Sequence, residues 1–488
     1  MTATPDHATD HDANEGHRLD ALRAIVGAAH VVSASQMDEP RRRRHLIDWR
    51  GRYEGLALAI VSPGSKDEVM AVMQRCSEWR WPVVAQGGNT SLVGGSVPDH
   101  TGRHLVLHLG RLQAVRHIDV DNLSITVEAG CTLDEVRQQA AQAGLLFPLS
   151  LASGGQCTIG GNLATNAGGT QVLRYGTARE LCLGLEVVTA SGTCWSNLSG
   201  LRKDNTGYDL RDLFIGSEGT LGLITAATLK LFPAPQGCAT ALMTCPDAAA
   251  AVALLRRART SLDAGLVAFE AMAAYPLQLV RQHLPALAHV LPAEAPWTVL
   301  IEHQGPRAQA VIEDELSALL HEATQTGLVL EARLAQTGVQ RQAMWHLREG
   351  IPLAEKTEGF MVKHDIGLPT SAIPAWLEAC ERALRERWPE GRVVCFGHLG
   401  DGNLHYNVQP PAACAQGDAF KAFEREVNTV VFDLVAQHGG TISAEHGIGQ
   451  LRQAELAQRA PPEGLAMMRA IKQALDPLGL LNPGRLLG

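Results

Sequence analysis

Several patterns that would assign a function at once are missing from this chain of 488 residues. Its ten cysteines are scattered without a Cys-x-x-Cys pair, which argues against structural zinc, iron–sulfur ligation or a disulfide framework. No apolar run approaches the length that spans a bilayer, and the N-terminal stretch is acidic where a secretory signal would be basic. The net charge of −9 gives no electrostatic footprint for nucleic acid. We therefore expect a cytoplasmic protein without a membrane span and without a nucleic-acid partner.

What is present indicates a globular chain with more than one hydrophobic core, since 45% of the residues are hydrophobic and 19% are charged. Short strands such as SITVEAG and GLEVVTAS alternate with capped amphipathic helices such as SKDEVMAVMQRCSEWR, which favours an α+β fold. The composition changes near Phe232, where alanine-rich helical stretches begin. We expect four parts: an N-terminal segment (1–50), a nucleotide-binding domain (51–235), a substrate or cap domain (236–450) and a C-terminal segment (451–488).

Three glycine-rich loops lie within or at the edge of the second part: GGNTSLVGG (87–95), SGGQCTIGGNLATNAGG (153–169) and IGSEGTLGLIT (215–225). Glycines allow successive backbone N–H groups to point into one concavity, and such nests bind phosphate oxygens. None of the loops has the spacing of a Rossmann or P-loop fingerprint. The loops therefore predict a dinucleotide-binding fold of another kind.

The stretch HLGDGNLH places two histidines around Asp401-Gly402, a dipeptide typical of tight hairpins. A two-residue turn there would set His398 opposite His405, and strand alternation would add Asn407 to the same face. Glu445, after the strand-like GGTIS, would complete a two-histidine, one-carboxylate site that suits Zn, Mn, Co or Fe. The alternative is that the histidines only form hydrogen bonds within a hairpin.

His446 follows Glu445 directly, and adjacent residues of a regular strand point in opposite directions, which favours separate roles for the two side chains. Its imidazole is the natural proton acceptor near neutral pH. The alternative is an ordinary turn histidine.

Together these motifs, with NTGYDLRDLFIGSEGTLGLIT and LLNPGRLL, resemble the flavoproteins related to vanillyl-alcohol oxidase and p-cresol methylhydroxylase. The similarity is strongest to the branch that contains D-2-hydroxyglutarate and D-lactate dehydrogenases, and it covers nearly the whole chain. It implies a two-subdomain FAD-binding domain at 51–235, an α+β cap domain with an antiparallel sheet and a C-terminal helical segment that returns to the FAD domain.

The resemblance also implies which residues surround FAD. Because Asn89 follows the paired glycines where some relatives carry a histidine linked to the flavin, we expect non-covalent FAD. The residues expected around the cofactor are Gly87, Gly88, Asn89, Thr90, Gly160, Gly161, Asn162, Thr165, Asn166, Gly168, Gly216, Glu218, Gly219, Ile224 and Asn482.

For the reaction, the resemblance implies that His398, His405 and Glu445 bind a divalent metal, with zinc favoured, and that His446 is the catalytic base. Arg348, Lys363, Asn407 and His446 would bind an anionic substrate. Pro352 stands where hydroxyglutarate dehydrogenases have a threonine, so a hydroxyl donor to the distal carboxylate is missing.

The sequence thus predicts an FAD- and metal-dependent D-2-hydroxy acid dehydrogenase that acts on CH–OH donors, with D-2-hydroxyglutarate favoured. Alternatives are a D-lactate dehydrogenase, the flavin subunit of a glycolate-oxidase-like complex, and a flavin-independent metal hydrolase or iron oxygenase. The electron acceptor would be an electron-transfer flavoprotein, a quinone or a cytochrome. A homodimer is compatible with the sequence.

Overall fold

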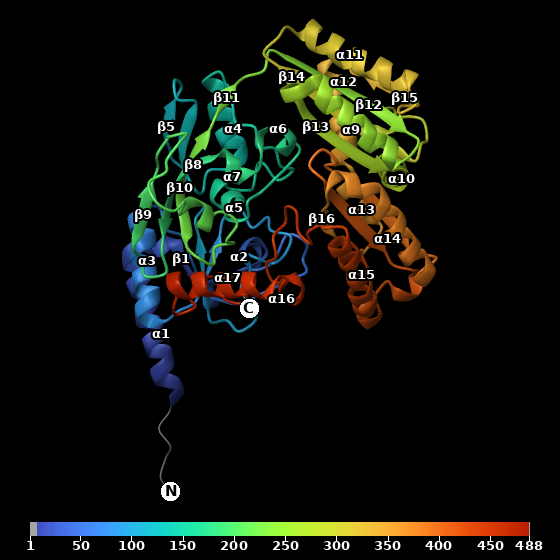
Figure 1. Cartoon of the computed structure of the whole chain (residues 1–488). Coiled ribbons are helices and arrows are strands. Elements are labelled where there is room, and N and C mark those ends of the chain that lie inside the picture. Colours follow the sequence, from blue (N-terminus) through green and yellow to red (C-terminus); the bar gives the residue numbers. More distant parts are fainter. Residues whose placement is uncertain (1–6, 488) are drawn as a thin grey trace.

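The computed structural model describes residues 7–487, with side chains from Glu15 onward, and contains two lobes that face each other (Figure 1). The first residues of the expected N-terminal segment lie outside the described part. The N-terminal lobe carries the glycine-rich loops, and the second lobe, drawn from yellow-green to dark orange, carries HLGDGNLH. Within residues 7–487, none of the helices combines the length and the apolar character that crossing a membrane requires.

The first sheet of the N-terminal lobe has the strand order β1-β2-β4-β3, in which β2 and β3 both run parallel to β4. Helix α3 begins after Ser65, whose hydroxyl accepts the Glu68 N–H, and its apolar side packs against this sheet. The elements are α1 (His7–Val26), β1 (Val31–Ser33), α2 (Glu39–His45), β2 (Ala57–Val61), α3 (Lys66–Trp79), β3 (Val83–Gln86) and β4 (His104–His108).

The second sheet is antiparallel, in the order β5-β6-β10-β8-β9, and its central strands β10 and β8 are buried. The first glycine loop lies between β3 and β4 of the first sheet, the second contains the short helix α5, and the third leads from α8 into β10. The elements are β5 (Val115–Asp119), β6 (Ser124–Glu128), α4 (Leu133–Gln142), β7 (Leu145–Leu146), α5 (Ile159–Ala164), α6 (Val172–Tyr175), α7 (Ala178–Leu181), β8 (Cys182–Val188), β9 (Cys194–Asn197), α8 (Arg211–Phe214), β10 (Leu223–Lys230) and β11 (Phe232–Pro233).

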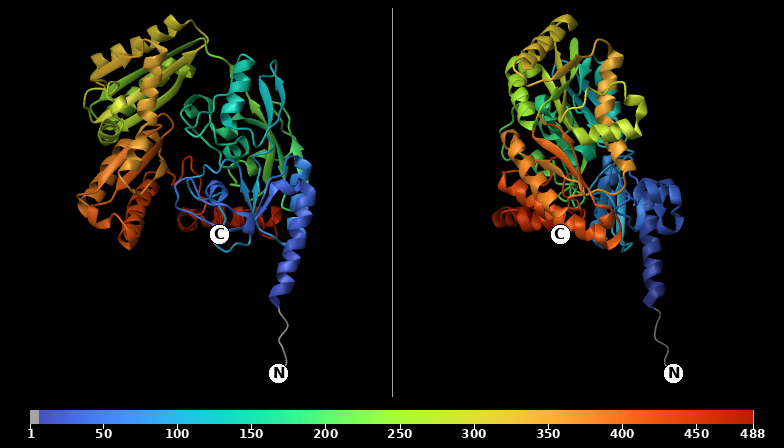
Figure 2. Two further views of the ribbon diagram at one scale, coloured as in Figure 1. Left: turned by 180° about the vertical axis from the view of Figure 1, so that it is seen from behind. Right: turned by 90° about the vertical axis from the view of Figure 1, so that its right-hand side faces the viewer.

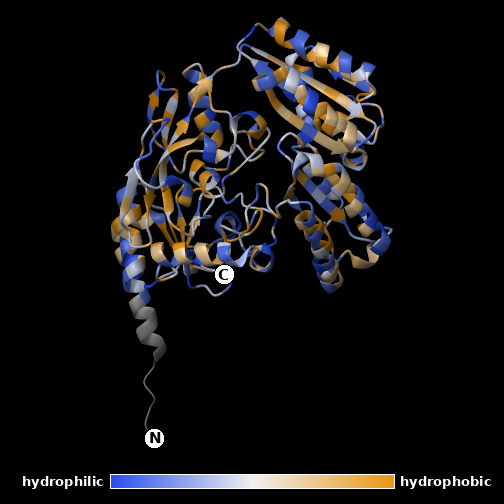
Figure 3. Ribbon diagram, viewed as in Figure 1, coloured by the Kyte–Doolittle hydropathy of each residue, from blue (hydrophilic) through white to orange (hydrophobic). Residues whose placement is uncertain are grey.

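The second lobe is built on a seven-stranded antiparallel sheet in the order β15-β12-β14-β13-β17-β18-β16. Helices cover both faces (Figure 2), and hydrophobic residues lie along the strands and helices of this lobe (Figure 3). Buried apolar side chains form one cluster on each side of the sheet. The elements are β12 (Gly237–Cys245), α9 (Ala248–Leu262), β13 (Leu266–Ala273), α10 (Ala274–His283), β14 (Trp297–Gly305), α11 (Gln309–Gln325), β15 (Glu331–Leu334), α12 (Gly338–Glu349), α13 (Ile351–Thr357), β16 (Asp365–Gly367), α14 (Ile373–Arg387), β17 (Arg392–Gly397), β18 (Asn403–Gln409) and α15 (Gly417–Gln437).

After α15 the chain crosses back to the N-terminal lobe, where α16 (Gln453–Arg459) and α17 (Pro462–Leu475) lie along its lower side (Figure 1). The tail then joins the edge of the first sheet: the Val83 N–H donates to the Leu480 carbonyl, and the Asn482 N–H donates to the Val83 carbonyl, both at 2.8 Å. The α+β fold class predicted from the sequence is confirmed. The strand expected at GGTIS is wrong, because only an isolated bridge between Thr441 and Gly367 forms there.

Candidate active site

A cavity of about 1650 Å³ lies between the two lobes. It exceeds the usual volume of a pocket for one small ligand, roughly 300–1000 Å³, so it has room for a large cofactor and a substrate together. The glycine loops line one wall, and the cap-domain strands β17 and β18 with the segment 445–446 line the other. Residues far apart in the sequence thus face a shared space.

Most of the residues expected around FAD line this cavity. They are Gly87, Gly88, Asn89, Thr90, Gly160, Gly161, Asn162, Thr165, Gly168, Glu218, Gly219, Ile224 and Asn482. Asn166 and Gly216 do not line it. The Asn166 carboxamide oxygen instead accepts the hydroxyl of Thr177 at 2.7 Å and the N–H of Arg179 at 3.0 Å, so it fixes the following turn.

The glycines of the first loop allow it to pack against the second loop without a gap. A Cβ atom on Gly88 would stand 1.9 Å from the Gln156 carbonyl oxygen, and one on Gly87 would stand 2.2 Å from the Thr158 hydroxyl. Both distances are far inside van der Waals contact. Close backbone approach of the two loops, rather than positive φ at these glycines, is therefore what the paired glycines provide.

Asn89 and Glu218 each hold the cavity wall in place through their side chains. The Asn89 carboxamide donates to the Arg44 and Ile47 carbonyls at 3.0 and 2.8 Å. The buried Glu218 carboxylate accepts the backbone N–H groups of Ile448 and Gly449, each at 2.7 Å, which joins the third loop to the segment after His446. Burial raises the pKa of Glu218 despite these two hydrogen bonds.

On the opposite wall, ligand atoms of His398, His405 and Glu445 lie within 4.8 Å of one another. His398 Nε2 is 3.4 Å from Glu445 Oε1, and the two imidazole rings meet edge to face with centroids 5.7 Å apart. The two-residue hairpin predicted to bring the histidines together is wrong. His405 pairs with Phe396 rather than with His398, and His398 lies in a longer connection after β17 has ended.

The connection after β17 is wider because the pairing of β17 with β18 ends at Phe396 and His405, while Gly397 pairs only with Ala271 of β13. The His398 carbonyl accepts the N–H groups of Asp401, Gly402 and Asn403 at 3.1–3.2 Å, which makes a compact loop in place of a two-residue turn. Asn407 does share a sheet face with His405, as alternation predicts, and both line the cavity.

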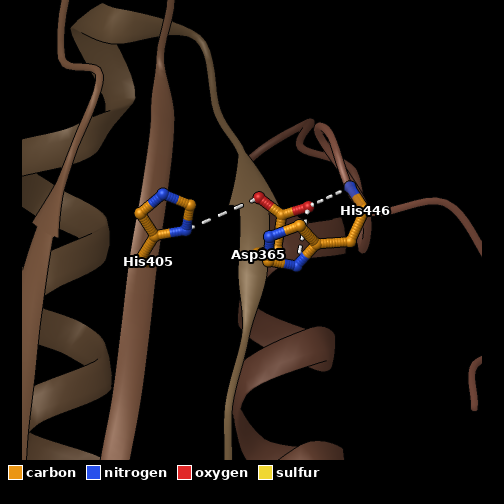
Figure 4. A group of neighbouring side chains, drawn as sticks. All are labelled: Asp365, His405 and His446. Atoms are coloured by element: carbon orange, nitrogen blue, oxygen red, sulfur yellow. Dashed lines mark hydrogen bonds and ion pairs between the residues drawn. The ribbon is translucent and has the colours of Figure 1, made fainter. Parts of the chain in front are cut away.

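His446 belongs to a second cluster that overlaps the first, formed with Asp365 and His405 (Figure 4). Asp365 lies on β16 directly opposite His405, and its Oδ2 accepts the backbone N–H groups of Glu445 and His446 at 2.9 and 2.8 Å. His446 Nδ1 is 3.6 Å from the same oxygen, and its ring stacks on that of His405. Asp365 thus fixes the segment that carries both predicted functional residues.

The charges of these clusters are set by burial and by their neighbours. Burial lowers the pKa of His446, against the attraction of Asp365, so its imidazole is neutral at pH 7 and able to accept a proton. Burial alone would lower the pKa of His398, but Glu270 and Glu445 raise it to about 9. Burial raises the pKa of Glu445 to about 7.

Glu270 joins the first cluster to Arg348 and is fully buried on β13. His398 Nδ1 donates to Glu270 Oε1 at 2.7 Å, and Arg348 Nε donates to Oε2 at 2.8 Å. Burial would raise the pKa of Glu270, but His398 and Arg348 together hold it below its ordinary value. The hydrogen bond fixes the His398 ring through Nδ1 and leaves Nε2 on the side of Glu445.

A similar buried carboxylate accompanies Lys363. Glu355 accepts a hydrogen bond from the Lys363 ammonium, and its other oxygen accepts the Asn407 carboxamide at 2.6 Å. Burial lowers the pKa of Lys363, against the attraction of Glu355. Arg348, Lys363 and Asn407 all line the cavity.

Sequence reasoning missed Asp365, Glu270 and Glu355. Glu270 stands alone among apolar residues in LVAFEAMA, and an isolated acid inside a buried strand was the signal available. Asp365 follows Lys363 after one residue in VKHDIG, but its contact with His405 comes from sheet pairing and leaves no local signature.

Two family models match the chain: "FAD binding domain" over residues 57–196 and "FAD linked oxidases, C-terminal domain" over residues 234–486. The chain is 37% identical to "D-2-hydroxyglutarate dehydrogenase, mitochondrial" of Bos taurus, over 96% of this chain and 83% of the relative. It is 38% identical to "D-2-hydroxyglutarate dehydrogenase" of Xanthomonas citri pv. viticola, over 95% of this chain and 96% of the relative.

Among solved structures, p-cresol methylhydroxylase with substrate bound superposes with a TM-score of 0.74 at 17% identity, over 97% of both chains. A 4-ethylphenol oxidase from Gulosibacter chungangensis superposes with a TM-score of 0.71 at 18% identity, over 99% of both chains. At these identities the likeness shows the fold, and the fold predicted by resemblance is confirmed.

Proposed function

We propose that this chain, which belongs to the FAD-linked oxidase family and is an FAD-dependent dehydrogenase, oxidises a D-2-hydroxy acid to the 2-oxo acid. D-2-hydroxyglutarate is the favoured substrate, because both relatives described above carry it in their names. The observation that carries the proposal is that His398, His405, Glu445 and His446 share one cavity with the glycine loops of the FAD-binding domain.

FAD is proposed to bind without a covalent link. The Asn89 side chain, at the position where some relatives carry a histidine linked to the flavin, is held by two backbone carbonyls and accepts a hydrogen bond from the Ser96 hydroxyl at 2.8 Å. Acid or heat denaturation should therefore release the flavin into the supernatant. Flavin that stays with the precipitated chain would contradict this part of the proposal.

The donor set at His398, His405 and Glu445 fits a divalent metal. Two imidazoles and a carboxylate suit zinc, manganese or cobalt. Ligating histidines usually donate their second N–H to a carboxylate, and His398 donates Nδ1–H to Glu270 in this way. A metal held there would make the hydroxyl of a bound 2-hydroxy acid more acidic.

His446 is proposed to take the hydroxyl proton of the substrate. Its imidazole is neutral near pH 7 and its position is fixed by the hydrogen bond of its backbone N–H to Asp365. Bound FAD would accept the hydride from the substrate Cα at flavin N5. Arg348, Lys363 and Asn407 would orient the anion, and the proton and the hydride together account for the two hydrogens that the alcohol loses.

Other D-2-hydroxy acids, D-lactate among them, remain alternatives as substrates, because Pro352 lines the cavity without a hydroxyl group. The electron acceptor is proposed to be an electron-transfer flavoprotein, a quinone or a cytochrome. Cytoplasmic location stays a prediction, and the name of the Bos taurus relative includes "mitochondrial".

Flavin reduction by a panel of D- and L-2-hydroxy acids, followed anaerobically in the metal-replete protein, tests the proposal. D-acids should reduce the flavin and L-acids should not, since the two enantiomers present different groups from Cα to the flavin. His446→Asn should slow reduction by about 10²–10⁴-fold at unchanged FAD content. The proposal would be refuted if no D-2-hydroxy acid reduced the flavin. It would also be refuted if a D-2-hydroxy acid reduced the flavin of His446→Asn at the rate measured for the unmodified protein.

A further inference from the structure

The two cations expected to hold the substrate, Arg348 and Lys363, each already have a buried carboxylate partner. Arg348 is paired with Glu270 and Lys363 with Glu355. The charge of each cation is therefore partly offset by its carboxylate partner, so neither offers its full positive charge to a second carboxylate of the substrate. A dicarboxylate needs a further cation in this cavity.

Arg50 lines the same cavity from the opposite wall, in the connection between α2 and β2. Among the described residues, no acidic side chain lies within 4.0 Å of its guanidinium, and no hydrogen bond holds its side chain. The side chain is accessible to solvent, and the cavity is the space that it faces. Its five donors are thus available to a ligand.

The backbone on both sides of Arg50 is held firmly. Asp48 is buried and accepts the Tyr53 N–H at 2.7 Å, and the Gly51 N–H donates to the Asp48 carbonyl at 2.9 Å. Arg52 then forms a two-pronged ion pair with Glu424 of the cap domain, at 2.7 and 3.0 Å. This pair joins the two lobes beside the cavity and keeps the Arg50 segment against it.

The field of Arg50 reaches the substrate-binding side chains. The Arg50 side chain is exposed to solvent within the cavity, but the protein around the cavity removes part of its hydration and so lowers its pKa, opposed by the attraction of Glu355, Asp48 and Asp365. Burial also lowers the pKa of His446 and of Lys363, and the charge of Arg50 lowers both further. Arg50, His446 and Lys363 line the same cavity, and the charge of Arg50 acts on both of the other side chains.

We propose that Arg50 binds the distal carboxylate of a 2-hydroxy dicarboxylate and so selects that substrate class, an inference that rests on the proposed function. Pro352 lines the cavity but offers no donor to a distal carboxylate. A guanidinium binds a carboxylate through two parallel hydrogen bonds, which gives both charge and orientation. Arg50 supplies from the N-terminal lobe what Pro352 cannot supply from the cap wall.

The test compares D-2-hydroxyglutarate with D-2-hydroxyvalerate, which has the same chain length without the distal carboxylate. Arg50→Gln should lower kcat/KM for D-2-hydroxyglutarate by about 10- to 100-fold, which is the scale of a lost charged hydrogen bond. The kcat/KM for D-2-hydroxyvalerate should change far less. Arg50→Lys should recover part of the loss, since lysine restores the positive charge but cannot form the two parallel hydrogen bonds of a guanidinium. Arg103→Gln, an exposed arginine of the same lobe outside the cavity, is the matched control. Equal losses on both substrates would overturn the inference.

A binding measurement separates this inference from the proposed function. The change in flavin absorption on adding 2-oxoglutarate or 2-oxovalerate reports affinity without turnover. Arg50→Gln should weaken the binding of 2-oxoglutarate at least about tenfold more than the binding of 2-oxovalerate. If no D-2-hydroxy acid reduces the flavin of the unmodified protein, the proposed function fails, while this binding ratio still decides the role of Arg50. An unchanged ratio would refute it.

Discussion

The two walls of the cavity are built in different ways. The FAD-domain wall consists of backbone brought close by glycines, as where Gly88 packs on the Gln156 carbonyl. The cap-domain wall consists of buried ionisable side chains, in which Glu270, Asp365 and Glu355 each bridge groups from different segments. The glycine loops are marked by residues that are near one another in the sequence. The pairing of the ionisable side chains depends instead on which strands the fold places side by side.

The largest expected effect concerns the cap wall alone. His405→Ala, or treatment with a chelator, should abolish dye-linked turnover without loss of FAD, because the histidine cluster and the glycine loops are separate structures. Zinc, manganese or cobalt should restore the chelated protein. Turnover, metal content and flavin absorbance are measured on the same samples.

The matched control for His405→Ala is His303→Ala, a buried histidine of β14 that pairs with Glu315 away from the cavity. It should retain metal and turnover if it folds. Full activity of His405→Ala in the presence of chelator would show that this cluster holds no functional metal.

A substitution in the other wall should give the opposite result. A methyl group on Gly88 would overlap the Gln156 carbonyl, so Gly88→Ala must separate the two loops. Overpacking of this kind costs about 1–3 kcal/mol, which predicts FAD affinity weaker by roughly 5- to 140-fold at unchanged metal content. Flavin release on dilution measures the affinity. Gly338→Ala, where a methyl group meets open space, is the control.

The contrast between the walls explains what the sequence could predict. The α+β fold, the capped helix after Ser65 and most of the cavity-lining glycines follow from contiguous motifs. The resemblance rests on the same motifs, and the family that it indicated is confirmed. Whether the individual residues contact FAD stays a prediction.

Apart from Asn166 and Gly216, which do not line the cavity, the errors and omissions lie in the cap wall. Asp401-Gly402 indicated a tight hairpin, but Gly397 adopts a positive φ, the strand ends there and the ladder register differs from the predicted one. Asp365 meets His405 only because β16 pairs with β18. Glu270 on β13 meets His398, which lies 128 residues later in the connection after β17. Sequence spacing carries no information about such pairings.

A smaller effect is expected from the carboxylate behind the metal cluster. Glu270→Gln keeps the size of the side chain but weakens the hydrogen bond that orients His398, and it leaves Arg348 without an anionic partner. Removal of such a partner lowers metal affinity by about 10- to 100-fold. Competition with a fluorescent zinc chelator measures the change. Glu302→Gln, a buried glutamate on the adjacent strand β14 outside the cavity, is the control, and equal losses in both variants would assign the effect to stability.

The smallest effect concerns pH and the stability of the cap lobe. Burial lowers the pKa of His364 to about 3, while its Nδ1–H donates to the Tyr406 carbonyl at 2.7 Å. In the unfolded chain His364 takes up a proton near its ordinary pKa of about 6.5, whereas in the folded chain it stays neutral. The contribution of the neutral His364 to the free energy of unfolding is therefore complete above about pH 6.5 and is lost as the pH falls towards the folded pKa. His364→Gln removes this pH dependence. As the pH is lowered from 7.5 to 5.5, the free energy of unfolding of the variant should therefore rise by about 1.4 kcal/mol relative to that of the unmodified protein. Amide exchange in β18, compared between the two proteins at each pH, measures the difference, with β10 of the FAD-binding lobe as the internal reference. A constant difference across this range would show that His364 does not stay neutral in the folded protein.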